Sequence, residues 1–235
     1  MKLAIMQPYL FPYLGYFQLI HAVDTFVFYD DVDFIKGGWI NRNRLIFNKE
    51  SHYFTIPLHK QSSFTLIKNT LINNRLYEKW KTKFLKSVKQ NYSKAPYFDP
   101  VYSLIEQVFT SDHESISTLA IDSVTRVCKY LDIDTSFEIS SQKYGHTIGY
   151  EKADRLIAIA KEKDYSEYIN LAGGKNLYDP AYFKSKGVHF SFIDHELLPY
   201  PQFSDTFESG LSIIDVLMFN SLKEIQSQIK KYKLI

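Results

Sequence analysis

The first thirty residues alternate between short apolar runs and a stretch with helical spacing. Residues 3–7 form an apolar run that Pro8 closes, and residues 25–29 form a second run of Thr, Phe, Val and Tyr. Both runs are typical of buried strands. Between them, apolar side chains recur at helical period from Tyr16 to Val23. A strand, a helix and a strand in this order predict a βαβ unit with two adjacent parallel strands.

The rest of the chain divides by its hydrophobic pattern into a helical middle and a second α/β part. Helices are predicted at about residues 77–92, 97–110, 115–131, 153–163, 180–185, 211–219 and 222–232. Strands are predicted at residues 52–58, 137–139, 168–170 and 188–192, with a variable loop over 60–75 that holds a short strand near 71–72.

These elements predict an α/β fold with a mostly parallel sheet and flanking helices. A chain of 235 residues is long enough for one large domain. We expect a single domain over residues 1–235, with α/β parts at about 1–75 and 135–235 and a helical segment at about 76–134.

The composition is ordinary for a globular protein except that aromatic residues make up 16% of the chain. A tyrosine has an apolar ring and a polar tip, so it suits pockets that stack flat or sugar-like ligands, although most tyrosines fill half-buried layers. The 28 basic and 26 acidic residues give a net charge of +2. This balance is unlike an electrostatic binder of nucleic acid, so no DNA partner is expected.

Cysteine usage and hydropathy indicate the compartment. Cys128, the single cysteine, excludes an intrachain disulfide and a multi-cysteine metal site. It falls on the apolar face of a predicted helix, so we interpret it as a core thiol. No segment reaches the roughly 18 consecutive apolar residues of a membrane span, and the apolar N-terminus is too short for a signal peptide. We therefore expect a cytoplasmic protein.

Three polar stretches follow predicted strands, at the edge where open parallel sheets bind ligands. The first covers residues 7–15, in which two prolines restrict the backbone and Gly15 allows close approach at the start of a helix. Helix N-termini favour anions such as phosphate. Gln7 can both donate and accept hydrogen bonds, as a sugar hydroxyl requires. The alternative is a purely structural turn.

The second stretch joins two carboxylates to a dense set of donors. Asp30 and Asp31 could hold Mg²⁺, accept a ribose hydroxyl or act as a base. Arg42 and its neighbouring asparagines could grip a phosphate or a carboxylate. Alternatively, the two aspartates cap a strand end and pair with Arg42 or Arg44.

The third stretch and the histidines give weaker signals. Gly173 and Gly174 precede Lys175, but the spacing is not that of a P-loop, and an ordinary turn is the alternative. His146 and His195 are acid–base candidates. No histidine has a metal-ligand partner at helical spacing, so no metal site is predicted.

Motifs along almost the whole chain resemble those of the WbqC-like family. The most specific is the opening Ile5-Met6-Gln7-Pro8-Tyr9-Leu10-Phe11-Pro12-Tyr13-Leu14-Gly15-Tyr16-Phe17. Similar motifs follow in order: Asp24, Tyr29-Asp30-Asp31-Val32, Trp39-Ile40-Asn41-Arg42-Asn43, Arg155-Leu156-Ile157, Ala172-Gly173-Gly174-Lys175 to Tyr178, Tyr200-Pro201-Gln202 and Leu211-Ser212-Ile213-Ile214-Asp215.

The resemblance implies a role in building bacterial surface polysaccharide. Members of that family are similar to proteins from clusters for O-antigen (lipopolysaccharide) biosynthesis, and some are named glycine transferases. It implies an N-aminoacyl, glycyl-type transferase that acts on a nucleotide-linked amino sugar. The alternatives are a non-catalytic module that binds a sugar nucleotide or glycan, and a nucleotidyl-transferring or adenylate-forming enzyme. The opening strand, loop and helix are loosely like nucleotidyltransferase-type folds, although Tyr16 stands where those folds have a histidine.

The transferase hypothesis assigns roles to residues of all three stretches. Asp30 or Asp31 is the first candidate for the base and His146 the second. Gln7, Tyr9 and Asn41 would orient the sugar, and Arg42 with the loop after Pro12 would hold the phosphates. Further substrate-binding candidates are Gly15, Tyr16, Asn43, Arg155, Gly173, Gly174, Lys175, Tyr178 and Gln202.

The glycyl group would have to arrive in activated form. It could be an adenylate that the protein makes from ATP with Mg²⁺, a carrier-bound thioester or a tRNA ester. The hypothesis requires residues 7–15 and residues 30–44 to face a shared cleft.

Overall fold

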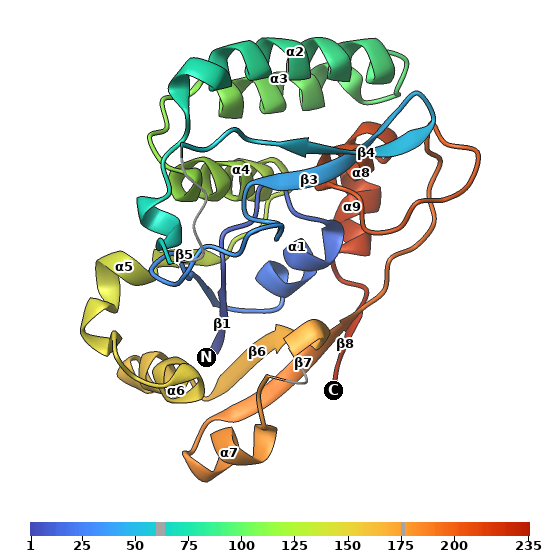
Figure 1. Ribbon diagram of the computed structural model, residues 1–235. Coiled ribbons are helices and arrows are strands. Elements are labelled where there is room, and N and C mark those ends of the chain that lie inside the picture. The colour runs from blue at the N-terminus through green and yellow to red at the C-terminus, as the bar shows by residue number, and fades with distance from the viewer. Residues whose placement is uncertain (60–63, 175–176) are drawn as a thin grey trace.

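The computed structural model describes residues 1–59, 64–174 and 177–235 (Figure 1). Within these ranges, six strands form a central sheet in the order β5-β2-β1-β6-β7-β8. The first five strands of this order run parallel, and β8 is antiparallel to β7 at one edge. The predicted α/β class with a mostly parallel sheet is confirmed. The strands are β1 (Lys2–Met6), β2 (Thr25–Phe28), β5 (Ser136–Ile139), β6 (Glu167–Leu171), β7 (His189–His195) and β8 (Tyr232–Leu234).

The predicted βαβ unit opens the fold. β1 pairs with β2 in parallel, from Leu3 opposite Thr25 to Met6 opposite Phe28, and α1 (Leu14–His21) connects them. Successive side chains of a strand point to opposite faces of the sheet. Ala4 accordingly packs in the core on one face, while its neighbours Leu3 and Ile5 pack on the other. Burial on both faces is why this segment is apolar without interruption.

Helices cover both faces of the sheet. The larger core lies on the face that holds α1, α4 (Ile116–Tyr130), α8 (Ile213–Phe219) and α9 (Leu222–Gln228). The opposite face is covered by α6 (Lys152–Glu162) and α7 (Pro180–Ser185). In Figure 1, α2 (Asn74–Tyr92) and α3 (Phe98–Thr110) form an outer layer. The short helices are α5 (Ser140–Lys143) and the 3-10 turns Ile67–Asn69, Gly145–Thr147 and Ala172–Gly174.

An antiparallel hairpin packs against α2 within the larger core. β3 (Arg42–Phe47) pairs with β4 (Glu50–Thr55) around Asn48 and Lys49, whose φ values are 50° and 69°. Two central residues with positive φ suit the twist of a two-residue hairpin. The sequence pattern predicts no strand at β3. The pattern was hard to detect because the turn lacks the glycine that usually marks such hairpins.

The C-terminal segment also differs from the prediction. The helix expected over residues 222–232 ends at Gln228 in α9, and the chain then turns to form β8 beside β7. Cys128 is 1% exposed in the larger core, as expected for a core thiol, and burial raises the pKa of its thiol. Every helix within the described ranges is too short or too polar to cross a bilayer.

Glu138 on β5 is a buried carboxylate whose ionised form the fold stabilises. It is 6% exposed and accepts hydrogen bonds from Lys143 at 2.7 Å, from Tyr144 at 2.5 Å and from Lys163. Burial alone would raise the pKa of Glu138, but these three hydrogen bonds lower it from 4.5 to about 2. The stabilisation is therefore complete at neutral pH and is lost as the pH falls from about 4.5 to about 2.

This gives the first prediction, a difference in acid stability between the wild type and Glu138→Gln. The variant should be less stable at neutral pH, and the difference should shrink in acid as the wild type loses its ionised carboxylate. Urea unfolding curves at a series of pH values would measure it. Glu78→Gln, which changes an exposed carboxylate on α2, is the matched control. Parallel stability curves for the wild type and Glu138→Gln would contradict the prediction.

Candidate functional site

The candidate site lies at the point in the sheet where the helices that connect the strands switch from one face to the other. β1 is flanked by β2 on one side and β6 on the other. The helix that leads from β1 to β2 packs on one face, whereas α6, which leads into β6, packs on the opposite face. The carboxyl ends of β1 and β6 therefore border a crevice, the place where open α/β sheets bind ligands.

A cavity of about 460 Å³ occupies this place, and we call it the switch-point cavity. It is built by the carboxyl ends of β1 and β6, by the segment after β2 and by the turn after β6. Its lining residues are Ile5, Met6, Gln7, Tyr9, Tyr29, Val32, Ile35, Leu156, Asn170, Leu171, Gly173, Leu177 and Tyr178.

Among the residues that the structure describes, none that lines the switch-point cavity is charged, and three are tyrosines. Burial raises the pKa of the Tyr9, Tyr29 and Tyr178 hydroxyls, so all three are neutral hydrogen-bonding groups at physiological pH. The carboxamides of Gln7 and Asn170 add donors and acceptors, and Asn170 uses its oxygen to accept from the Leu171 N–H at 2.8 Å. Rings with a few carboxamides suit a neutral ligand that has a flat face and hydroxyl edges.

A second cavity of about 320 Å³ lies beside the first, and we call it the His195 cavity. Tyr9 lines both cavities, so the two adjoin at this residue. The other lining residues come from the end of the first loop, the segment before β3, the end of β7 and the segment before α8: Pro12, Tyr13, Trp39, Asn43, His195, Leu197 and Gly210.

Asn43 ties the first two polar stretches together. Its carboxamide nitrogen donates to the carbonyl oxygens of Leu10 at 3.1 Å and Phe11 at 2.8 Å. The Leu10 N–H in turn donates to the Trp39 carbonyl at 3.3 Å. Phe11 has a φ of 40°, a conformation that a bulky residue adopts only when its surroundings hold it there. Residues of both stretches therefore line one cavity, as the sequence hypothesis required.

Asp30 and Asp31 are buried away from both cavities. Asp31 pairs with Arg155 at 2.6 Å, its side chain is fully buried, and its other oxygen accepts from Ser140 at 2.6 Å. Both oxygens of Asp30 accept hydrogen bonds from Ser140 and Ser141. Every carboxylate oxygen is already bonded, so the geometry gives neither aspartate an open path to a substrate amine.

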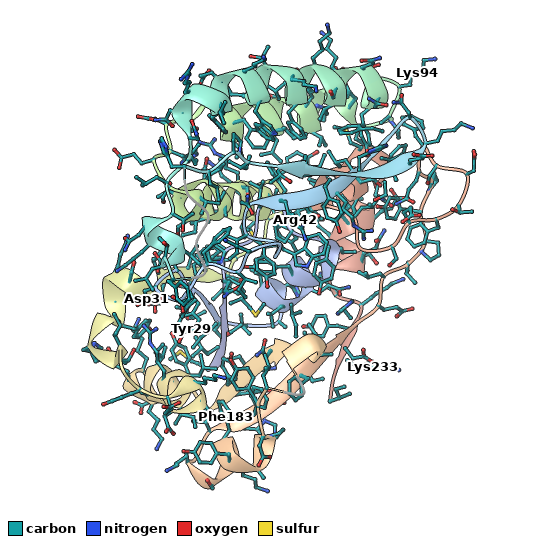
Figure 2. All side chains as sticks on the ribbon, in the orientation of Figure 1. Tyr29, Asp31, Arg42, Lys94, Phe183 and Lys233 are labelled. Carbon is teal, nitrogen blue, oxygen red and sulfur yellow. The ribbon has the colours of Figure 1, made fainter. Side chains whose placement is uncertain are left out.

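Arg155 packs against one of the rings that line the switch-point cavity. Its guanidinium lies 4.8 Å from the centre of the Tyr29 ring, which lines the cavity (Figure 2). The Arg155 side chain is only 6% exposed, so its charge is buried. The two sequence candidates Asp31 and Arg155 do meet in space, but as a pair that fixes the Tyr29 ring.

Four further candidates of the first two stretches are held by the protein itself. The Tyr16 hydroxyl donates to the Gln7 carbonyl at 2.8 Å inside the core. Asn41 donates to the Ile56 carbonyl at 3.1 Å. Arg42 donates to the carbonyls of Gly37 and Gly38 and lies 4.6 Å from the Tyr53 ring (Figure 2). Gly15 makes room for protein atoms, because a Cβ there would lie 3.0 Å from Tyr13 Cζ and 3.1 Å from His195 Cγ.

The remaining candidates are Gln202, His146, Gly174 and Lys175. Gln202 donates to the buried Asp215 at 3.1 Å and to the Glu208 carbonyl, outside both cavities. His146 is 62% exposed and pairs with Glu162 at 2.9 Å on the surface. Gly174 belongs to a short 3-10 turn, and Lys175 lies outside the described residues.

Several lining residues were not among the sequence candidates, chiefly Tyr13, Tyr29, Trp39 and Asn170. His195 was considered only as one of two possible acid–base histidines. The usable signal was position, because Asn170 and His195 lie at the carboxyl ends of β6 and β7. In the described part of the chain, no three His, Cys, Asp or Glu side chains gather as a possible metal site.

Comparison with known proteins identifies the family. The model of the WbqC-like protein family matches residues 7–227. The chain belongs to the WbqC-like family. This WbqC-like protein is also similar to the uncharacterized protein Rv1507c of Mycobacterium tuberculosis (strain ATCC 25618 / H37Rv), with 28% identity over 222 residues that cover 93% of each chain. No solved structure matches it.

Proposed function

We propose that this WbqC-like protein is an N-aminoacyltransferase of the glycyl type, acting on a nucleotide-linked amino sugar for bacterial O-antigen or a related surface polysaccharide. The observation that carries the proposal is the pair of cavities that share Tyr9. A transfer reaction needs two substrates whose reacting atoms meet across a short distance. Two cavities that adjoin at Tyr9, at the edge of a parallel sheet, offer places for two substrates side by side.

The two cavities differ in the ligand that each suits. The switch-point cavity, at about 460 Å³, combines three tyrosine rings with the carboxamides of Gln7 and Asn170, which matches a sugar ring and its hydroxyls. The uncharged walls suit the sugar itself better than the phosphates. The His195 cavity, at about 320 Å³, is smaller and mostly apolar, which matches a small acyl group.

The chemistry requires an unprotonated amine. The amine nitrogen of the sugar attacks the carboxyl carbon of the activated glycyl group, an N–C bond forms, and the bond to the leaving group breaks. A base must accept the proton that the nitrogen loses. Neutral walls also favour the reaction because they do not stabilise the protonated amine.

The second prediction is that the purified protein transfers a glycyl group. Nucleotide-linked amino sugars would be incubated with glycine and ATP-Mg²⁺, with glycyl thioester or with glycyl-tRNA, and mass spectrometry would detect the N-glycyl sugar nucleotide. The N-acetylated form of each sugar nucleotide is the control, since it has no free amine. Release of pyrophosphate with ATP and glycine would identify an adenylate made by the protein itself.

Other outcomes separate the competing functions. Tight binding of a sugar nucleotide without product from any donor would contradict transfer and support a non-catalytic binding module. Pyrophosphate exchange without transfer to any amine would instead support an adenylate-forming enzyme.

A further inference from the structure

The imidazole of His195 borders two cavities. It is half-buried at the carboxyl end of β7 and lines the His195 cavity. It also lines an outer hollow of about 430 Å³ beside β8. The imidazole therefore lies between the proposed acyl pocket and this outer hollow.

One ring nitrogen of His195 is enclosed by the protein, without a partner in the described part of the chain. Its Nδ1 is buried and has no hydrogen-bond partner among the described residues. Buried polar atoms of native proteins are nearly always paired, so an unpaired one calls for a functional reason. The Tyr13 ring packs edge-on against the imidazole at 5.4 Å, and the missing side chain of Gly15 makes room for both.

The position of His195 is fixed from the side of α1. The fully buried Gln18 uses its amide nitrogen to donate to the carbonyls of Glu196 at 3.2 Å, Gln228 at 2.8 Å and Lys231 at 3.0 Å. These bonds clamp the chain just after β7 to the helix and to the segment that leads into β8. A base must be held in place in this way to act on one atom of a substrate.

Burial keeps His195 neutral in the resting protein. Asp194 precedes it on β7 and Glu196 follows it, and Lys231, Tyr232 and Lys233 face the outer hollow, where burial raises the pKa of the Tyr232 hydroxyl. On the inner side the titratable neighbours are the Tyr9 and Tyr13 hydroxyls, and burial raises the pKa of both. Burial lowers the pKa of His195 itself, against an opposing effect of the Asp194 charge. At neutral pH the imidazole therefore has a free acceptor nitrogen.

We propose that His195 is the general base of the transfer reaction, an inference that rests on the proposed function. The sugar amine attacks the glycyl carbon, and the imidazole takes the proton that the nitrogen loses. The electron pair of the broken bond leaves with the phosphate, thiol or tRNA oxygen of the donor. The imidazolium form of His195 then returns its proton to that group or to solvent through the outer hollow. Atoms and charges balance without a further reactant.

The third prediction compares histidine variants. His195→Gln should lower kcat by about 100-fold or more, the usual contribution of a general base, and leave KM for the sugar nucleotide nearly unchanged. In the wild type, kcat/KM should decline in acid through two ionisations, that of the substrate amine and that of His195, which should titrate below the ordinary histidine pKa of 6.5. His195→Gln should lose only the second of these ionisations. The matched control is His52→Gln, which removes an exposed histidine beside Glu50 on β4, outside both cavities, and should retain full activity.

A second measurement keeps this inference separate from the function it rests on. The imidazole signals of His195 in isotope-labelled wild type would be followed by NMR while a nucleotide-linked amino sugar or its N-acetylated counterpart is added. We expect the free amine to shift these signals and the N-acetyl form to have a much smaller effect. If the wild type forms no product but its His195 signals still respond to the free amine, the transfer reaction is overturned. The contact between His195 and the amine is then still supported.

Two outcomes would overturn the inference itself. One is a His195→Gln variant that keeps the kcat of an active wild type and the ionisation of kcat/KM assigned to His195. The transfer reaction would then stand, but another group would be its base. The other is a His195 signal that does not respond to the amine.

Discussion

Replacement of Asp31 by alanine is expected to lower the free energy of unfolding by about 3–5 kcal/mol, because it leaves a buried guanidinium without its counter-ion. The side chains of Asp31 and Arg155 are 0% and 6% exposed, so water cannot replace the lost carboxylate. Ser140 loses an acceptor at the same time. Urea unfolding monitored by circular dichroism would measure the loss.

Two comparisons identify the cause of this loss. Asp205→Ala breaks an ion pair with Lys49 in which the Lys49 and Asp205 side chains are 69% and 79% exposed, and it should cost less than about 1 kcal/mol. The double variant Asp31→Leu with Arg155→Met should recover much of the stability, since it removes both buried charges. An Asp31→Ala protein as stable as the Asp205→Ala control would contradict the assignment of a buried pair.

The ion pair also bears on ligand binding. Arg155 stacks on Tyr29, and Tyr29 lines the switch-point cavity. An Arg155 released from Asp31 would leave that ring free to move. The aspartate that the sequence offered as a base is thus better explained as a positioning residue for a wall of the cavity.

Replacement of Gly15 by alanine should lower kcat/KM by about 100-fold, because a small displacement of a catalytic group has effects of this size. The added Cβ would overlap the Tyr13 ring and lie 3.1 Å from His195 Cγ, so both walls of the His195 cavity must shift. Overpacking of this kind should also cost about 1–3 kcal/mol of stability. Steady-state kinetics and urea unfolding would measure the two effects.

Another glycine provides the control. A Cβ at Gly145 would meet no atom within 4 Å, so Gly145→Ala should change neither activity nor stability. Adding Tyr13→Ala to Gly15→Ala should relieve the overlap and restore much of the stability, whereas activity should stay low because the cavity has lost a wall. If Gly15→Ala alone were as active and stable as Gly145→Ala, the packing of Tyr13 and His195 over the helix start would be refuted.

Asp31→Ala and Gly15→Ala both change residues that keep a cavity wall in place. Other residues of the sequence motifs also keep neighbouring segments in place. Asn43 fixes the strained loop at Phe11, with distances of 3.1 and 2.8 Å to two of its carbonyls. Gln202 and Tyr200 hold the fully buried Asp215, at 3.1 and 2.8 Å. Gln202 and Asp215 thus stabilise the fold outside both cavities, whereas other residues of the same motifs, among them Gln7, Tyr9 and Trp39, line the cavities.

The sequence by itself determined the local elements and the first sheet pairing. Strands such as residues 3–7 and helices such as 77–92 were recognisable because burial on one or two faces imposes a short, local period on the chain. The same reasoning identified Cys128 as a core thiol. It missed β3, whose apolar run is short and whose turn uses Asn48 and Lys49 in place of glycine.

Only the tertiary structure decided which polar residues are free to meet a ligand. Asp31 looks available in sequence, but its partner Arg155 lies 124 positions away, on α6 across the sheet. His195 had no distinguishing neighbours in sequence, and its role follows from its contact with Tyr13 and Gly15 at the other end of the chain. The physical reason is that hydrophobic periodicity is a local property, whereas the pairing of a polar group is settled by whichever distant segment the fold places beside it.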